Sequence, residues 1–210
     1  MRIDTSQDYF VSDPHFGHEL MRRLRGFETI KEMDQVLVDA WNGVVWDGDR
    51  VICLGDFCLG GLRVAREYFA RLNGTISILC NMDHHDKRWL RKFVDRRNGR
   101  FDKTIPIDSK SGIMVKLLPP LWSIDLDERE EYRKKIVLCH FPIQRWNLSH
   151  YGSWHLHGHS HGKLSSEGML RMDVSVDALE GFAPISLEEI KTEMKRREEE
   201  GVNYRPWEKD

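Results

Sequence analysis

The chain has 210 residues, of which 40% are hydrophobic and 31% are charged, and its formal net charge is −2. This composition is typical of one globular domain with a sizeable core, and it excludes a disordered chain. A nearly neutral chain also lacks the excess of basic residues that an extended nucleic-acid surface needs, so any site for an anion must be local.

Strands and helices are predicted to alternate along the first half of the chain. Short apolar runs predict strands at residues 9–11, 50–54 and 75–79. Apolar residues at helical spacing predict helices at residues 29–45, 63–72 and 89–97. This alternation is typical of an α/β fold.

The second half continues with shorter elements. Strands are predicted at residues 113–118, 135–138, 154–157 and 169–176. The charged segment 119–133 is expected to be an insertion loop or a hairpin tip, and a charged helix and tail occupy residues 186–210. That helix begins with Ser186-x-x-Glu189, the pattern of a capping box. No repeat or low-complexity segment divides the chain, so we expect a single domain over 1–210.

The sequence contains neither a secretory signal nor a membrane span that we can identify. The first eight residues have no apolar segment, and no apolar run is long enough to cross a bilayer. The four cysteines include no Cys-x-x-Cys pair, so buried thiols are expected rather than a structural zinc site. These features favour a cytoplasmic location.

Polar side chains follow three of the predicted strands. Asp13 comes after the strand at 9–11, Asp56 after the strand at 50–54, and Asn81 after the strand at 75–79. Ligands of α/β proteins bind beyond the carboxyl ends of the strands. We therefore expect these three side chains at one edge of the sheet.

Histidines add a second set of candidate ligands. His140 follows the strand at 135–138, and four histidines alternate at positions 155, 157, 159 and 161. Taken singly, each candidate can be a turn residue, a cap, a hydrogen-bonded core histidine or part of a solvated loop. Together they offer carboxylate oxygen and imidazole nitrogen, which suit manganese, iron, zinc, cobalt or nickel better than magnesium or calcium.

In order and spacing, these residues resemble the calcineurin-like metallophosphoesterase superfamily. The matching motifs are Asp13-x-His15, Gly55-Asp56, Asn81-x-Asp83, His140 and Gly158-His159-x-His161. The segments 12–18, 154–162, 174–177 and 184–190 resemble a small bacterial and phage branch of it. The resemblance implies an α/β fold in which two mixed β-sheets pack as a sandwich flanked by helices, a metallophosphoesterase-like four-layer fold.

The resemblance also implies a dinuclear metal centre and a reaction. Asp13, His15 and His161 would hold one divalent transition-metal ion, manganese before the others. Asn81, His140 and His159 would hold the second ion, and Asp56 would bridge the two. The implied reaction is hydrolysis of a phosphate ester by a metal-bridging hydroxide.

The third motif departs from the family, which usually has Gly-Asn-His-Asp where this chain has Cys80-Asn81-Met82-Asp83. Cys80 requires a backbone that tolerates a side chain and can bring a thiol near the metals. Met82 replaces the histidine assigned to protonation of the leaving group, and methionine cannot donate a proton. Either His84 or His85 takes over this role, or the substrate has a good leaving group, or the enzyme is weak. A phosphodiester of small or nucleotide type is therefore favoured over a monoester.

Several neighbours are further candidates, each with an ordinary alternative. His84 is the first candidate for the acid, although both it and His85 can simply begin an exposed helix. His18 can contact phosphate or support His15, or it can be a turn residue. Asp83 can orient a neighbouring histidine. The arginines at 22, 23 and 25 can steer an anionic substrate, but they are expected on a solvated helix face. His157 would face the same side as His159 only in an extended segment.

Two other functions remain open at this stage. A metal-dependent nuclease shares the ligands, but no long basic stripe is present to bind DNA. A protein-binding module on the same fold, catalytically weak or inactive, would have no reason to keep all seven ligand residues. We expect a small phosphorylated substrate, such as a nucleotide, as the partner, and no membrane. The sequence leaves the oligomeric state open.

Overall fold

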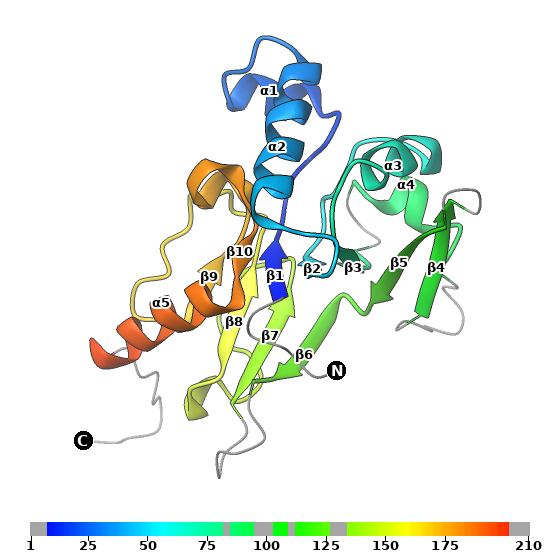
Figure 1. The fold of residues 1–210 in the computed structure, drawn as a ribbon. Coiled ribbons are helices and arrows are strands. Elements are labelled where there is room, and N and C mark those ends of the chain that lie inside the picture. Colours follow the sequence, from blue (N-terminus) through cyan, green and yellow to red (C-terminus); the bar gives the residue numbers. More distant parts are fainter. Residues whose placement is uncertain (1–7, 82–84, 95–102, 109–111, 127–133, 202–210) are drawn as a thin grey trace.

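The computed structural model describes residues 8–81, 85–94, 103–108, 112–126 and 134–201, whose strands form two mixed sheets (Figure 1). The six-stranded sheet has the order β10-β1-β2-β3-β5-β4. Its strands are β1 (Asp8–Val11), β2 (Arg50–Cys53), β3 (Thr75–Leu79), β4 (Lys103–Asp108), β5 (Ile113–Leu118) and β10 (Ile185–Ser186). The four-stranded sheet, in order, contains β6 (Leu121–Asp125), β7 (Lys135–Cys139), β8 (Trp154–His157) and β9 (Arg171–Asp173).

Both sheets have a parallel centre. Strands β1, β2, β3 and β5 run parallel, with β10 and β4 antiparallel at the two edges. In the second sheet β7, β8 and β9 are parallel, and β6 pairs antiparallel with β7. A bridge between Ser12 and Ser175 links the segments that follow β1 and β9. The carboxyl ends of strands from both sheets therefore meet in one region.

The helices are α1 (Glu19–Leu24), α2 (Ile30–Val44), α3 (Leu62–Phe69), α4 (Lys87–Leu90) and α5 (Leu187–Glu199). Short 3-10 segments lie at Ser149–Tyr151, Val176–Ala178 and Glu180–Phe182. Helices α2 and α5 each start with a capping box, formed by Thr29 with Glu32 and by Ser186 with Glu189. These boxes satisfy backbone donors that the first helical turn leaves unpaired.

Two apolar clusters occupy the two faces of the six-stranded sheet. Successive side chains of a strand point to opposite faces. Val11 therefore joins a cluster with buried residues of α1 to α4, while Phe10 joins a cluster shared with the four-stranded sheet and α5. In Figure 1, α5 lies at the lower left and α3 and α4 at the upper right. The predicted fold, a sandwich of two mixed sheets flanked by helices, is confirmed.

Three predicted elements differ from the structure. The helix predicted at 89–97 is wrong in its bounds, because α4 spans Lys87–Leu90 and a turn follows at 91–93, while residues 95–97 lie outside the described part. The strand predicted at 169–176 is shorter, because after Asp173 the chain turns to pair with Ser12. The segment 119–133 begins as β6, which forms a hairpin with β7, while residues 127–133 lie outside the described part. None of the described helices is long and apolar enough to cross a membrane.

Candidate metal centre

The predicted ligands lie on loops at the carboxyl ends of β1, β2, β3, β7 and β8. Backbone hydrogen bonds tie these loops together: Asp13 N–H donates to the Gly55 carbonyl at 3.1 Å, and His15 N–H donates to the Asp56 carbonyl at 3.0 Å. Gly158 N–H donates to the His140 carbonyl at 2.9 Å, which joins the ends of β7 and β8. These backbone hydrogen bonds thus fix the positions of the Cα atoms from which the predicted ligands extend.

The backbone is strained at these loops. Seven non-glycine residues in the described part of the chain have a positive φ, and five of them are predicted metal ligands. The five are Asp13, His15, Asp56, His159 and His161, with φ between 48° and 66°. Such conformations cost about 1–3 kcal/mol each and cluster at functional sites. Strain concentrated on the predicted ligands indicates that their placement serves a function other than stability.

One group of side chains surrounds Asp13. Its Oδ1 lies 3.5 Å from His15 Nε2 and 3.7 Å from His161 Nε2. The rings of His15 and His161 stack, with centroids 5.2 Å apart. The other carboxylate oxygen, Oδ2, accepts a hydrogen bond of 2.8 Å from His159 N–H, which fixes the carboxylate's orientation. These three side chains are those predicted for the first metal.

Asp56 lies between this group and His140. Its Oδ2 is 3.7 Å from His15 Nε2 and 3.5 Å from His140 Nε2. His140 is 1% exposed, and its ring centroid is 5.3 Å from that of His159. The predicted bridging residue therefore stands next to ligands of both predicted metals.

Asn81 and His140 both border Gly55. A Cβ placed on Gly55 would lie 3.3 Å from His140 Nδ1 and 3.8 Å from the Asn81 Cβ. Asn81 is buried, with 5% of its surface exposed, whereas His159 is exposed. The structure thus brings all seven predicted ligands to one region, with the histidine end open to solvent.

The spacing of the donor atoms is that of ligands on a common ion. Two donors with metal bonds of about 2.1 Å and an angle of about 90–120° lie about 3.0–3.6 Å apart. The pairs above, at 3.5 to 3.7 Å, are too long for good hydrogen bonds and lie at or just above the upper end of this range. In the described structure, buried Asp13 Oδ1 and both ring nitrogens of His15 have no hydrogen-bond partner. Buried polar atoms rarely stay unsatisfied, so they fit a cation.

Burial and neighbouring charges set the protonation of these groups. Burial lowers the pKa of His15 to about 4, although Asp13 acts in the opposite direction. Burial by itself would raise the pKa of Asp13, but His15, His140 and His161 hold it well below its usual range. Burial, followed by the carboxylates of Asp13 and Asp86, raises the pKa of Asp56 to about 8. At neutral pH, His15 and Asp13 are already in the forms that bind metals.

His18 and His85 form a further cluster with His15. The ring centroids are 5.2 Å apart for His15 and His18, 5.0 Å for His15 and His85, and 4.8 Å for His18 and His85. The Nε2 of His85 lies 4.0 Å from Asp56 Oδ2, and its side chain is 31% exposed. His85 therefore does not begin an exposed helix; it faces the centre. Asp83 and His84 lie outside the described residues, as does Met82.

Asp86, to which the sequence analysis assigns no role, holds this loop in place. It is fully buried and accepts hydrogen bonds from the N–H groups of Phe57 and Cys58 and from Trp89 Nε1. Burial raises its pKa to about 6. It connects the loop after β2 to α4, which fixes His85 beside Asp56. A charged residue between two histidines and two basic residues gave no sequence signal of burial.

The three arginines in α1 and at its C-cap differ in exposure and in their partners. The Arg23 side chain is 65% exposed, as predicted for a solvated helix face. Arg22 is paired with Glu19 and donates to the Phe27 carbonyl. For Arg25 the prediction is wrong, because its side chain is only 2% exposed and binds Asp177. Nothing in the local sequence distinguishes Arg25, because its partner lies 152 residues away.

His155, His157 and the four cysteines are buried or partly buried within the fold. His155 is a buried core histidine that bonds to the Val137 carbonyl and accepts from Ile143 N–H. His157 is fully buried and does not share the exposure of His159, because the strand ends between them. Cys80 lies in the apolar cluster between the sheet and the helices, and none of the four cysteines forms a disulfide.

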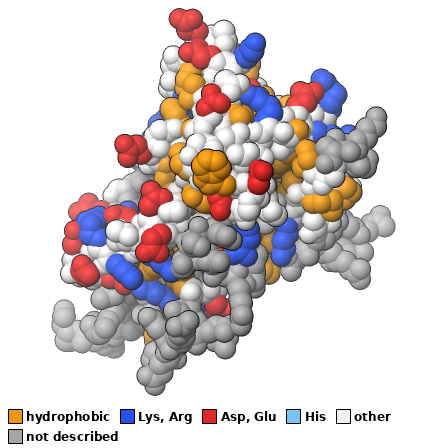
Figure 2. Space-filling model, in the orientation of Figure 1, with side chains coloured by type: hydrophobic (Ala, Val, Ile, Leu, Met, Phe, Trp, Pro, Cys, Tyr) orange, Lys and Arg blue, Asp and Glu red, His pale blue; other side chains and the backbone are white. Residues whose placement is uncertain are grey.

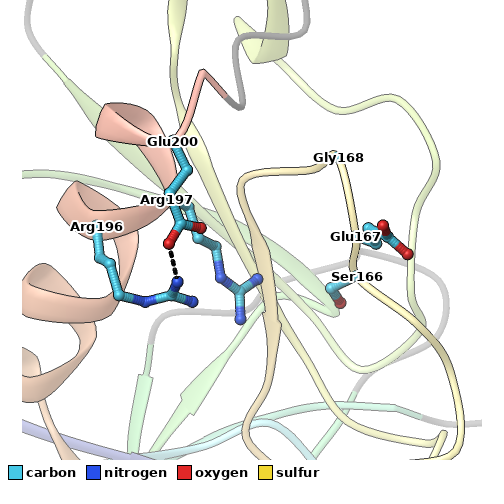
Figure 3. A pocket seen from close by; sticks show the side chains of 6 residues that line it. All are labelled: Ser166, Glu167, Gly168, Arg196, Arg197 and Glu200. Atoms are coloured by element: carbon cyan, nitrogen blue, oxygen red, sulfur yellow. Dashed lines mark hydrogen bonds and ion pairs between the residues drawn. The ribbon is translucent and has the colours of Figure 1, made fainter.

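The molecular surface offers two further observations. On the face in Figure 2, acidic and basic side chains are interspersed, most densely over α5. A pocket of ≈ 250 Å³ lies between the end of α5 and residues 166–168 (Figure 3). Its Arg196 and Arg197 are paired with Glu193 and Glu200, and no predicted site residue lines it. This pocket is therefore not the candidate site, because it contains none of the predicted ligands and its arginines are already paired with glutamates.

Comparison with known proteins supports the fold. No protein-family model matches the chain. An uncharacterized protein of Methanocaldococcus jannaschii is 28% identical over 192 residues, which cover 87% of this chain and 88% of that protein. The gene 66 protein of Mycobacterium phage L5 is 24% identical over 185 residues, which cover 76% and 79%. The crystal structure of a protein of unknown function from Aquifex aeolicus superposes with a TM-score of 0.59 at 20% identity, covering 89% of this chain and 98% of that one. That structure shares the fold, and none of these names specifies an activity.

Proposed function

We propose that this protein is a metal-dependent hydrolase of phosphate esters, a member of the calcineurin-like metallophosphoesterases. The observation that carries the proposal is the convergence of strained, buried carboxylates and imidazoles around Asp56 at the spacing of metal ligands. The order of the motifs along the chain supports the same function. A cytoplasmic location and a small phosphorylated substrate remain part of the proposal.

The residues present fit two divalent transition-metal ions. Asp13, His15 and His161 would hold one ion, Asn81, His140 and His159 the other, and Asp56 would contact both. Mixed oxygen and nitrogen donors favour manganese, with iron, zinc, cobalt or nickel as alternatives. Bound cations would supply the positive charge that holds a phosphate group and would activate water as a nucleophile.

The protein's own contribution is a rigid, partly open frame. Buried Asp13, His15, Asp56 and His140 keep their side chains in fixed positions, so little reorganisation is needed when substrate binds. His159 is exposed, and the side chains of His85 and His161 are 31% and 21% exposed. Substrate would therefore approach over these three histidines.

His85 is the described side chain that we assign to proton donation. It lies beside Asp56, and its partial exposure lets it recover a proton from solvent. His18 Nδ1 accepts a hydrogen bond from Met21 N–H, so in the neutral ring Nε2 carries the hydrogen and can donate to a phosphate oxygen. With His85 in this role, Met82 no longer limits the enzyme to esters with good leaving groups. The expected preference for a phosphodiester then rests on the loss, at Met82, of the phosphate-contacting histidine that the resemblance implies, and not on the leaving group.

Replacing His85 by glutamine tests this assignment. General acid catalysis contributes about 10²–10⁴-fold, and most of it is needed when the leaving group is a poor one. We expect hydrolysis of alkyl esters to fall by about 10²-fold or more, with a much smaller loss for aryl esters. Rates across a series of leaving groups and metal content are the measurements, with His150→Gln, an exposed histidine, as the control. Equal losses for all leaving groups would contradict the role, and loss of a metal would make His85 a ligand.

Restoring metals to chelator-treated protein tests the function itself. Manganese, iron, cobalt, nickel, zinc and magnesium are added singly, with an aryl phosphodiester and the matching monoester as substrates. We expect manganese or another transition metal to restore hydrolysis, with the diester cleaved faster. Faster cleavage of the monoester would change the proposed substrate class, but the proposed metal-dependent mechanism would stand. Bound metal without hydrolysis of either ester would contradict the proposal.

The nuclease and the protein-binding module are less well supported. The interspersed charges of Figure 2 and the net charge of −2 offer no single-signed surface for a DNA backbone on that face. DNA cleavage with steep salt dependence in the same assay would favour the nuclease. A binding module would have no need for strain at five ligand residues, and inactivity with every metal would favour it.

A further inference from the structure

His161 is oriented by a carboxylate on the side of the ring away from Asp13. Its Nδ1 lies 2.6 Å from Asp177 Oδ2, and its Nε2 lies 3.7 Å from Asp13 Oδ1. Because Asp177 takes the hydrogen on Nδ1, the lone pair of Nε2 points to the candidate metal position. A carboxylate bound to the outer nitrogen also makes a histidine a stronger ligand.

Arg25 holds that carboxylate with both ends of its guanidinium. Its Nε donates to Asp177 Oδ1 at 2.7 Å, and its Nη2 donates to Asp177 Oδ2 at 2.8 Å. Paired hydrogen bonds of this kind fix the carboxylate plane as well as its position. With 2% of its side chain exposed, Arg25 is shielded from competing water.

The same guanidinium also holds the backbone of the first ligand loop. Arg25 Nη2 donates to the Asp13 carbonyl at 2.8 Å, and Nη1 donates to the Pro14 carbonyl at 2.8 Å. These carbonyls lie in the loop where Asp13 and His15 have positive φ. One cation at the end of α1 therefore connects the loop of Asp13 and His15 with the residue that orients His161.

We propose that Arg25 and Asp177 are positioning residues for the first metal site, setting the affinity of Asp13, His15 and His161 for one ion without contacting it. The inference rests on the proposed metal centre but not on the reaction it performs. The hydrogen bonds of this pair reach His161 and the backbone of Asp13 and Pro14, which belong to the first site, so its effect should fall mainly on one of the two ions. Removing such outer partners costs about 10–100-fold in metal affinity.

The test is calorimetric titration of metal-free protein with manganese, using Asp177→Asn. The wild type should bind two ions, and the variant should bind one of them about 10–100-fold more weakly and the other unchanged. His161→Ala identifies which binding event belongs to the first site. Arg23→Gln, which removes an exposed arginine of the same helix, is the matched control. If Asp177→Asn does not fold, Arg25→Lys is measured in the same way, since lysine keeps the charge and loses the paired hydrogen bonds.

The outcomes distinguish the positioning role of Arg25 and Asp177 from the proposed phosphoesterase function. Two ions bound by Asp177→Asn as by the wild type would overturn the positioning role and leave the phosphoesterase proposal standing. Equal weakening of both ions, with a lower melting temperature, would mean that the pair only stabilises the fold. A wild-type protein that binds no ion would overturn this inference together with the proposed function.

Discussion

Replacing Asp56 by asparagine is expected to abolish hydrolysis while making the metal-free protein more stable. Asp56 is 2% exposed, and burial together with Asp13 and Asp86 raises its pKa to about 8. In the unfolded chain an aspartate has a pKa of about 3.9. The folded protein therefore holds a proton that the unfolded chain releases, and the stability from this group is lost as pH rises from about 4 to 8.

Asparagine has nearly the same shape and cannot ionise. We therefore expect the metal-free variant to gain stability of the order of a few kcal/mol at pH 8, and less toward pH 5. Metal binding should weaken because the shared anionic ligand is gone, and activity should fall by about 10³-fold or more. A variant that gains stability and loses activity is typical of a functional site whose buried charged groups reduce the stability of the fold.

The measurements are thermal melts at pH 5 and pH 8, with and without manganese, alongside the ester assay. Asp39→Asn, on the exposed side of α2, is the control and should change neither property. An Asp56→Asn protein that is less stable at pH 8 without metal would show that the carboxylate has a structural role. Retained activity would remove Asp56 from the centre.

Replacing Gly158 by alanine, which adds a single methyl group, is expected to disrupt the candidate metal centre by crowding Asp13. A Cβ on Gly158 would lie 2.1 Å from Asp13 Oδ2, 2.1 Å from Ser12 Oγ and 2.6 Å from Ser12 Cβ. Gly158 is buried between β8 and the loop of Asp13, so the chain cannot simply move outward. Gly158→Ala must therefore displace Asp13 or separate the two sheets where Ser12 pairs with Ser175.

Overpacking of this kind costs about 1–3 kcal/mol, occasionally more. A displacement of about 1 Å at a reacting group can cost about 10²-fold in rate, so we expect at least that loss of activity. The first metal should also bind more weakly, because Asp13 belongs to that site. Gly43→Ala is the control, since a Cβ there meets nothing within 4 Å and the residue lies within α2. Normal activity and metal binding in Gly158→Ala would show that the loop can open without harm.

The sequence by itself determined the α/β class and the edge at which the predicted ligands gather, while the sandwich of two mixed sheets was implied by the family resemblance. Apolar runs that end in Asp13, Asp56 and Asn81 predict strands and mark their carboxyl ends, because a parallel strand must be buried and its loop carries the polar group. The alternating histidines of β8 and of the loop after it were equally visible. The capping box at Ser186 was predicted from four letters, because its bonds are local.

Only the tertiary structure decided which neighbours support the ligands. Asp86 has no sign of burial in its own segment, yet it is buried and accepts hydrogen bonds from the N–H groups of Phe57 and Cys58, which lie in another loop. His85 faces Asp56 for the same reason. Arg25 and Asp177 are 152 residues apart, and only the junction of the two sheets brings them together. Local sequence patterns predict the secondary structure of a residue's own segment. The charge and shape around the candidate centre instead arise from contacts between segments that are distant in the sequence.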